Sequence, residues 1–348
     1  MKLQHSVPLA TYSSLHVGGP AETLIELEPG DDLHAILTPY KQPIWVLGDG
    51  TNCLISDKGL PGIVVINHAG EIEQLGDNQL RADSGVVWDD LVQKAIELAL
   101  YGLEFSSGIP GSVGAAVVGN IAAYGHSVAK CLVEATLLDT ADGSIITWKN
   151  QDFGFDYRTS ALQKAANKNL IVLNATFEFS PEPTGKLEYD SALKVAQELG
   201  IEPDSLTHRR QIILETRQRA GSLLDPHHVS ARTAGSFFKN PMVSPEQVQA
   251  LIAHEESGVS QQQLLHQNKI HGGSSVRVSA AHVLLAAGFE RGQTWDNVRL
   301  HPDHILKIEN IGQATAQEIY DVVQEILKTV QRKLNIVLEP EVRFLGEF

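Results

Sequence analysis

The chain has 348 residues, 43% of them hydrophobic, which is enough for about two domains with ordinary cores. It carries 27 Lys and Arg residues against 42 Asp and Glu residues, a formal charge of −15. This balance argues against nucleic acid or an anionic membrane as a partner. Any anion that the protein binds must therefore be held by a local basic site. We expect small-molecule substrates and a monomer.

The two cysteines, Cys53 and Cys131, are too few for a disulfide framework and have no metal-like spacing, so we expect both to be reduced and buried. The first residues lack the apolar region of a secretion signal. No later stretch is long and apolar enough to span a bilayer. These features predict a cytoplasmic protein.

Residues up to about 225 predict an α+β organisation. Short β-branched and apolar runs indicate strands, and the apolar spacing of residues 88–101 predicts a helix that ends before Gly102. The predicted strands are residues 44–47, 53–55, 63–66, 132–138, 144–148 and 170–179.

Residues 226–335 predict a second, more helical unit, with helices at 245–253, 280–287 and 315–334. The last of these has a continuous apolar stripe, and Thr315 with Glu318 forms a capping box at its start. Residues 336–346 then alternate like a final strand, which Pro340 places at an edge or a bulge.

Two glycine-rich segments are candidates for binding a diphosphate or a flat ring through backbone N–H groups. The first lies between two predicted strands, so a simple hairpin turn is an alternative; for the second, which has no charged residue, a close-packed core turn is the alternative. The candidate residues are Gly48, Asp49, Gly50, Thr51 and Asn52 in the first segment, and Ser107, Gly108, Ile109, Pro110, Gly111, Ser112, Gly114 and Ala115 in the second.

Three other places offer groups for chemistry. Ser236 lies between a glycine and two phenylalanines, with Lys239 and Asn240 close behind, although a strand end with core phenylalanines would look the same. Arg158 follows an aromatic run that would shelter it, where a solvated ion pair is the alternative. Glu341 and its neighbour Glu339 flank Pro340 and would share one face of a strand, unless both are surface carboxylates.

Two histidine pairs do not predict a metal site. The run 301–304 has two imidazoles and a carboxylate, but no further ligand cluster occurs at a recognisable spacing. The same holds for His227 and His228. We expect no bound metal.

Taken together and in order, these segments resemble the UDP-N-acetylenolpyruvoylglucosamine reductase family. The motifs that carry the resemblance are residues 48–52, 109–114 with Asn120 and 123–125, 157–158, 234–241 and 338–344. The likeness runs from about Thr11 to Gly346, nearly the whole chain. Five collinear motifs are far more specific than any one of them.

The resemblance implies an FAD-binding unit of the p-cresol methylhydroxylase type, made of two α+β subdomains, and a C-terminal α+β substrate-binding domain. We expect the FAD-binding unit at 1–225, with subdomains of about 1–68 and 69–225, the substrate domain at 226–335, and a final strand at 336–348 that returns to the FAD-binding unit. The family reduces the enolpyruvyl ether of UDP-N-acetylglucosamine with NADPH, in peptidoglycan synthesis. The implied cofactor is non-covalent FAD, with NADPH as the reductant.

The resemblance also assigns roles. Arg158 stabilises the negative charge that develops on the substrate, Glu341 assists as a protonated hydrogen-bond donor, and Ser236 donates the proton. Further implied contacts are Asn120 and Tyr124 to the cofactor, and Tyr157, Tyr189, Arg217, Arg219, Lys239 and Asn240 to the substrate.

One departure from the family pattern is Ala220, which stands where a lysine aligns; Arg219 would have to replace it. Tyr189 matches the subgroup in which a tyrosine closes over the nucleotide. Two other functions stay open: a sugar-alcohol oxidase on the same flavin scaffold, and a catalytically silent nucleotide-sugar binding protein. Many such oxidases attach flavin through a histidine in the first glycine-rich motif, which residues 48–52 lack.

Overall fold

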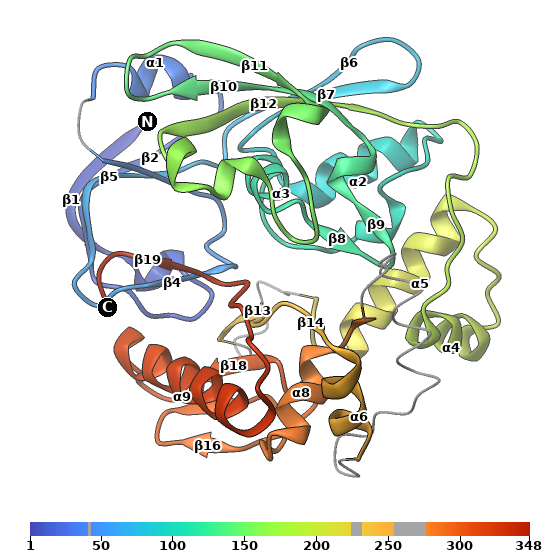
Figure 1. Cartoon of the computed structure of the whole chain (residues 1–348). Coiled ribbons are helices and arrows are strands. Elements are labelled where there is room, and N and C mark those ends of the chain that lie inside the picture. The colour runs from blue at the N-terminus through green and yellow to red at the C-terminus, as the bar shows by residue number, and fades with distance from the viewer. Residues whose placement is uncertain (41–42, 224–231, 254–275) are drawn as a thin grey trace. The chain divides into compact units, whose positions relative to one another are not determined.

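The computed structural model describes residues 1–40, 43–223, 232–253 and 276–348 (Figure 1). The chain forms two compact units, each built from several stretches. The first unit comprises Met1–Val7, Ala21–Asp49 and Pro61–Leu224. The second comprises Pro8–Pro20, Gly50–Leu60 and Asp225–Phe348. The subdivision of the FAD-binding unit near residue 68 stays a prediction.

The first unit contains a sheet of order β1-β2-β5-β3, in which β3 and β5 run parallel. Its strands are β1 (Lys2–Pro8), β2 (Pro20–Glu26), β3 (Ile44–Leu47) and β5 (Leu60–Ile66). Helix α1 (Leu33–Leu37) starts at Asp32, whose carboxylate accepts hydrogen bonds from the N–H groups of His34 and Ala35.

A second sheet of the first unit is antiparallel, in the order β11-β10-β12-β7-β6. Its strands are β6 (Ile72–Gln74), β7 (Gln79–Asp83), β10 (Leu132–Asp139), β11 (Ile145–Lys149) and β12 (Leu170–Glu178), and a two-stranded ribbon adds β8 (Ala122–Ala123) and β9 (His126–Ser127). Helices α2 (Trp88–Glu97) and α3 (Val113–Gly119) share one core with this sheet, centred on the buried rings of Trp88 and Phe177.

Helices α4 (Asp190–Leu199) and α5 (Leu206–Arg219) complete the first unit. A buried ion pair fixes α5: the guanidinium of Arg209 donates to the Glu104 carboxylate at 2.7 Å, and the two side chains are only 7% and 0% exposed. Glu104 also accepts the Gly102 N–H at 2.7 Å, and Arg209 donates to the Pro203 carbonyl at 3.0 Å. Buried charges need such partners because desolvation is unfavourable without them.

The second unit has a sheet of order β13-β18-β17-β16 and two two-stranded ribbons, β14-β15 and the parallel pair β4-β19. The bounds are β4 (Cys53–Ile55), β13 (Thr233–Ser236), β14 (Met242–Val243), β15 (Val276–Arg277), β16 (Thr294–Trp295), β17 (Val298–Leu300), β18 (Lys307–Asn310) and β19 (Arg343–Leu345), with helices α6 (Pro245–Ala253), α8 (Ala280–Ala286) and α9 (Ala316–Leu334). The predicted helices 245–253, 280–287 and 315–334 are confirmed.

Helix α9 shows why its prediction succeeded. The Thr315 hydroxyl accepts the Glu318 N–H, and the Glu318 carboxylate accepts the Thr315 N–H at 2.7 Å, which is the expected capping box. The apolar stripe from Ile319 to Leu334 is buried in the core of the second unit. The Asp57 carboxylate adds two more acceptors for the N–H groups of Ala316 and Gln317, both at 2.9 Å.

Two local predictions and one of the alternatives were wrong. Helix α2 ends at Glu97 rather than near 101, because Ala99 adopts a φ of +56° and Tyr101 pairs with Ser180 instead. The final strand is only β19, since residues 336–342 are not in regular strand pairing apart from the bridge of Pro340 with Phe238. Residues 48–52 are no hairpin turn, because β3 pairs with β5 and β4 pairs with β19.

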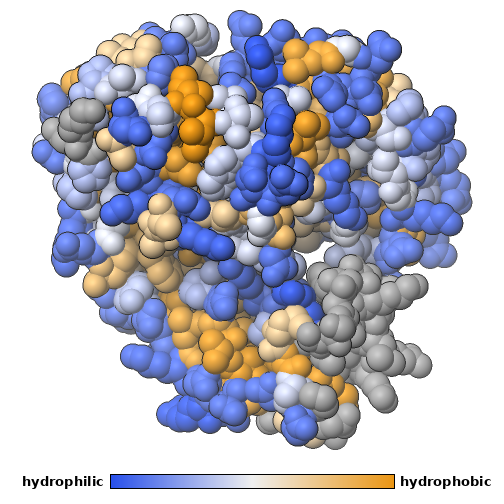
Figure 2. Space-filling model, turned by 45° about the horizontal axis from the view of Figure 1, so that its top comes forward, coloured by the Kyte–Doolittle hydropathy of each residue, from blue (hydrophilic) through white to orange (hydrophobic). Residues whose placement is uncertain are grey.

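Hydrophilic residues surround separate hydrophobic areas on the face shown in Figure 2. No helix within the described ranges is both long and apolar enough to cross a membrane. Cys53 and Cys131 are free and buried as expected, and burial raises the pKa of each thiol to about 12.

We predict that Glu104→Gln lowers the free energy of unfolding by about 3–5 kcal/mol, because it leaves the Arg209 charge buried without its carboxylate. Chemical denaturation followed by circular dichroism measures the change. Glu97→Gln is the matched control, since Glu97 forms an exposed pair with Lys94 at 3.8 Å and its loss should cost less than about 0.5 kcal/mol. Equal effects of the two substitutions would contradict the prediction.

Candidate active site

Gly48 and Asp49, the part of the first glycine-rich segment that lies in the first unit, pack against the second segment. The Gly111 N–H donates to the Asp49 carboxylate at 2.9 Å. A Cβ on Gly48 would come within 2.9 Å of the Ser112 hydroxyl oxygen, so the two segments approach closely there. Asp49 thus joins the two segments, rather than facing a ligand with its whole carboxylate.

His68 holds the other oxygen of Asp49. Its Nε2 lies 3.0 Å from Asp49 Oδ1, and this hydrogen bond lowers the pKa of Asp49 and raises the pKa of His68. Each group favours the charged form of the other. His68 was not identified from the sequence, because nothing in its local pattern points to Asp49.

Helix α5 and helix α2 hold Gly108 by both of its backbone groups. The Gly108 N–H donates to Asp89 Oδ1 at 2.7 Å, and the Gly108 carbonyl accepts from Arg217 Nε at 3.2 Å. Arg210 forms a bidentate pair with Asp89 at 2.7 and 2.6 Å. Burial raises the pKa of Asp89, but the bonds from Arg210 and Gly108 outweigh it and leave the pKa below its usual range.

These segments fit FAD. Gly108 and Gly111 have φ values of +71° and +111°, which favour glycine, and Gly114 packs on Ser84 so closely that a Cβ would lie 2.9 Å from the Ser84 Cβ. Backbone without side chains can approach phosphate oxygens and a flat ring directly. Ser107 is fully buried and donates its hydroxyl to the Glu104 carbonyl, and its predicted cofactor contact stays a prediction.

A cluster of aromatic and basic side chains forms a second part of the site in the first unit. The rings of Tyr124 and Tyr189 meet edge to face with centroids 5.3 Å apart. Burial raises the pKa of Tyr189 to about 12, and the charges of Tyr157 and Arg158 also act on it. Burial lowers the pKa of Arg217, which senses the charges of Tyr124 and Arg158. Five predicted residues from four segments therefore lie near one another: Tyr124, Tyr157, Arg158, Tyr189 and Arg217.

Arg158 occupies a tight turn. Its φ is +55°, and the turn is closed by mutual backbone hydrogen bonds between Asp156 and Thr159. The Asn120 amide donates to the Asp156 carbonyl at 2.9 Å and accepts the Ala129 N–H at 3.1 Å. Asn120 thus positions the arginine turn, and its predicted contact with the cofactor stays a prediction.

In the second unit, Ser236 ends strand β13 beside a β-bulge. It faces Lys307 of β18, and the register shifts between Thr233 and Ser236, where Gly235 has a φ of +76°. A bulge re-aims the side chain next to it. Phe237, fully buried, anchors the strand end in the core.

Glu341 lies on the segment next to Ser236. Its N–H donates to the Phe237 carbonyl at 2.7 Å, and the Lys239 N–H donates to the Glu339 carbonyl at 2.9 Å. Asn52 donates its side-chain amide to the Glu341 carbonyl at 3.4 Å. The second unit therefore brings two of the three predicted catalytic residues onto neighbouring segments.

The predicted substrate contacts differ in their surroundings. Asn240 accepts the Ala280 N–H at 2.9 Å and so caps helix α8. Lys239 Nζ lies 3.7 Å from the exposed Glu339. Arg219 is 43% exposed and pairs with the carboxylates of Glu198 and Glu215. The structure therefore gives no support to Arg219 as a replacement for a lysine at Ala220.

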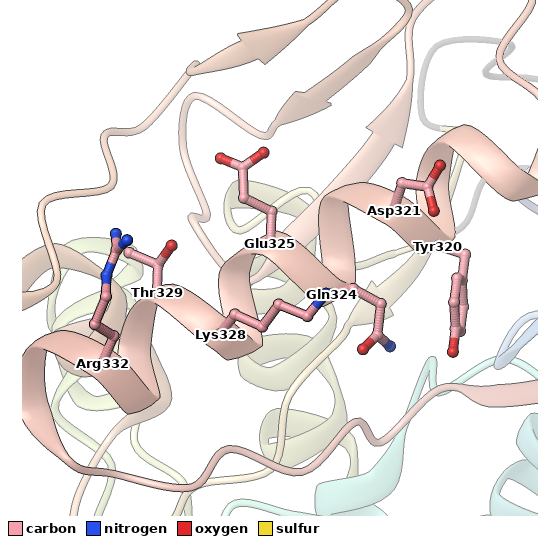
Figure 3. Close-up of a pocket in the computed structure, with 7 residues that line it drawn as sticks. All are labelled: Tyr320, Asp321, Gln324, Glu325, Lys328, Thr329 and Arg332. Atoms are coloured by element: carbon pink, nitrogen blue, oxygen red, sulfur yellow. The ribbon is translucent and has the colours of Figure 1, made fainter.

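The described residues contain no group of three His, Cys, Asp or Glu side chains suited to a metal. His227 and His228 lie outside the described residues. A pocket of about 760 Å³ runs along α9 between Tyr320 and Arg332, but it holds none of the predicted site residues (Figure 3). Its polar side chains all come from one helix and do not converge.

Two family models and several known enzymes match the chain. Residues 225–345 match the model of the UDP-N-acetylenolpyruvoylglucosamine reductase C-terminal domain, and residues 30–149 match an FAD binding domain. The UDP-N-acetylenolpyruvoylglucosamine reductase of Mycobacterium marinum is 32% identical, with 99% of this chain and 96% of that protein covered. The chain belongs to this family. The enzyme of the same name from Thermobifida fusca is 30% identical over 98% of this chain and 97% of its own length.

The solved structures agree on the fold. The crystal structure of the UDP-N-acetylenolpyruvylglucosamine reductase from Thermus caldophilus aligns with a TM-score of 0.64 and 23% identity, covering 99% of this chain and all of that one. The expected α+β fold, an FAD-binding domain with a separate C-terminal domain, is confirmed. FAD as the cofactor and NADPH as the reductant are confirmed by family membership.

We predict that Asp89→Asn weakens FAD binding by about 10-fold, because it removes the charge that holds Arg210 and the Gly108 N–H. Titration of the apoprotein with FAD, followed by flavin fluorescence, gives the Kd. Asp90→Asn is the control, since Asp90 is the exposed next residue of the same helix and its loss should leave the Kd within about twofold. An unchanged Kd for Asp89→Asn would show that the loop does not depend on this carboxylate.

Proposed function

We propose that Ser236, Arg158 and Glu341 carry the chemistry of the family's reaction in this chain. The chain is an FAD-dependent reductase that converts UDP-N-acetylenolpyruvoylglucosamine to UDP-N-acetylmuramate with NADPH, a step of peptidoglycan synthesis. Family membership over 99% of the chain supports the reaction. The hydrogen bond that joins the Ser236 and Glu341 segments is the observation that supports their joint role.

If bound, FAD would supply the chemistry of hydride transfer, from NADPH to the terminal carbon of the enolpyruvyl group. The glycine-rich segments 48–52 and 107–115 hold it, with Asp49 and Asp89 keeping their backbone in place. The absence of a histidine in residues 48–52 favours non-covalent binding.

Arg158 stabilises the negative charge left on the substrate carboxylate and the adjacent carbon. A guanidinium fixed in a turn needs little reorganisation when this charge develops, which is where electrostatic catalysis is most effective. Arg217 adds a second positive charge nearby. A chain with a formal charge of −15 thus concentrates positive charge at an anionic substrate.

Ser236 gives its hydroxyl proton to the carbon next to the carboxylate. The bulge beside it and the buried Phe237 fix the direction of this hydroxyl. Glu341 acts beside Ser236, from the segment whose backbone bonds to the Phe237 carbonyl.

The nucleotide part of the substrate contacts Tyr189, Tyr157 and Arg217. An edge-to-face pair with Tyr124 orients the Tyr189 ring, and an aromatic face suits a uracil base. Neither alternative function, a sugar-alcohol oxidase or a silent binding protein, finds support in the comparisons. We further propose that the protein is a cytoplasmic monomer. Sedimentation velocity measures its mass in solution and so tests the oligomeric state.

We predict that Ser236→Ala separates the two halves of the reaction. Reduction of FAD by NADPH involves no protonation of substrate carbon and should proceed nearly as in the wild type. Reoxidation by the enolpyruvyl substrate should slow by about 10²- to 10⁴-fold, the usual loss on removal of a general acid. Stopped-flow absorbance of the flavin measures both rates.

If Ser236→Ala slows both halves equally, Ser236 has a structural or binding role. If it slows neither, the proton comes from another group, with Tyr157 or a water near Glu341 next to be tested. Ser244→Ala is a suitable control, because Ser244 instead caps helix α6 through the Gln247 N–H.

We predict that Tyr189→Ala raises the KM for the substrate by about 10-fold, while flavin reduction by NADPH stays close to wild type. Steady-state kinetics give the KM, and stopped-flow gives the reduction rate. Tyr40→Ala, which removes a half-buried ring from another core cluster, serves as the control and should leave the KM unchanged. The same KM for Tyr189→Ala and wild type would place Tyr189 in the fold alone.

A further inference from the structure

A buried lysine lies directly across the sheet from the proposed proton donor. Lys307 begins strand β18, is 2% exposed, and is the register partner of Ser236 on the neighbouring strand β13. Directly opposed residues of an antiparallel pair have Cβ atoms about 4.5–5.5 Å apart on the same face. The lysine side chain therefore starts beside the Ser236 hydroxyl.

This face of the sheet is charged. Glu309, two residues after Lys307, is 3% exposed and is the register partner of Thr233 and of Arg299. Its carboxylate accepts hydrogen bonds from Arg299 at 2.9 and 2.7 Å. Glu309 also lies 3.6 Å from His301 Nε2 through its Oε1. Lys307 and Glu309 thus place buried charged side chains on the face that carries Ser236.

Lys307 lies close to His304, and the charge of its side chain acts on that imidazole. The backbone N–H of Lys307 donates to the His304 carbonyl at 2.9 Å. Burial lowers the pKa of His304 to about 4, and the charge of Lys307 adds to this effect. A positive charge in a buried place acts over a longer range than in water.

We propose that Lys307 is a positioning residue that acts through Ser236, stabilising the serine oxygen after it has given up its proton and returning a proton to it. This inference rests on the proposed role of Ser236. Serine is a poor acid in water, so a proton donor of this type needs a nearby group that favours its anion.

The proton transfers balance. The Ser236 O–H bond breaks as a C–H bond forms on the substrate, and the electron pair of the O–H bond stays on Oγ. One N–H bond of the Lys307 ammonium then breaks as a new O–H bond forms on Ser236. The neutral amine regains a proton from water before the next turnover. No electron leaves or enters in these steps.

The test is a double-mutant cycle of Lys307→Met and Ser236→Ala, read by stopped-flow on the FAD-loaded protein. We expect Lys307→Met to slow flavin reoxidation by the substrate by about 10- to 100-fold, the loss of a nearby charged group, and to leave reduction by NADPH unchanged. In the Ser236→Ala background, the same substitution should change reoxidation by less than about twofold. Lys307→Arg, which restores the charge, should recover part of the rate.

Lys333→Met is the matched control. Lys333 is a lysine of the same unit that donates to the Ala287 carbonyl at 2.6 Å, and its loss should leave both half-reactions unchanged. Thermal unfolding of every variant shows whether a slow variant is merely misfolded. A Lys307 variant that fails to fold is replaced by Lys307→Gln, which keeps length and polarity without the charge.

Three outcomes overturn the proposal. A full Lys307→Met effect in the Ser236→Ala background means that Lys307 acts on the substrate or the fold and not through Ser236. A higher KM with unchanged reoxidation at saturating substrate means that Lys307 binds substrate. Wild-type rates mean that Lys307 has no part in the reaction. Failure of the Ser236 role itself is distinguishable, because Ser236→Ala alone would then leave reoxidation fast.

Discussion

The buried ion pair between Glu104 and Arg209 fixes helix α5, and the first part of the candidate site depends on where α5 lies. The same helix carries Arg210, which binds Asp89, and Arg217, which binds the Gly108 carbonyl. A glycine-rich loop has few side chains with which to hold its own shape. Here that shape is supplied from outside, by charges on a helix about 100 residues later in the chain.

Local signals predicted the elements that depend on local interactions. Helix α9 has a capping box and one apolar stripe, and both were confirmed. Helix α5 was not predicted, because its inward side includes the buried Arg209 and Thr216 and so shows no single apolar stripe. The early end of α2 depends on the distant Ser180, which no local pattern could indicate.

The prediction of the candidate site shows the same difference between local and distant interactions. Motif order identified Ser236, Arg158 and Glu341 as candidates, and the structure shows Ser236 and Glu341 on neighbouring segments of one unit. The residues that hold the glycine-rich segments in place were missed, since Asp89 and His68 are ordinary polar residues in the sequence. Their roles depend on partners 19 to 121 positions away, which only the fold brings near.

The parallel pairing of β4 with β19 also affects the order in which the two units fold. The register joins Cys53 to Arg343, about 290 residues apart in the chain. Strand β4 is synthesised early, but it cannot pair until β19 has been synthesised near the end of the chain. The first unit can already form its own sheets before then. Contacts of such long sequence separation form slowly because the intervening chain must first be ordered. The second unit is thus the last to fold, and β4 stays without its partner strand throughout synthesis of the residues between.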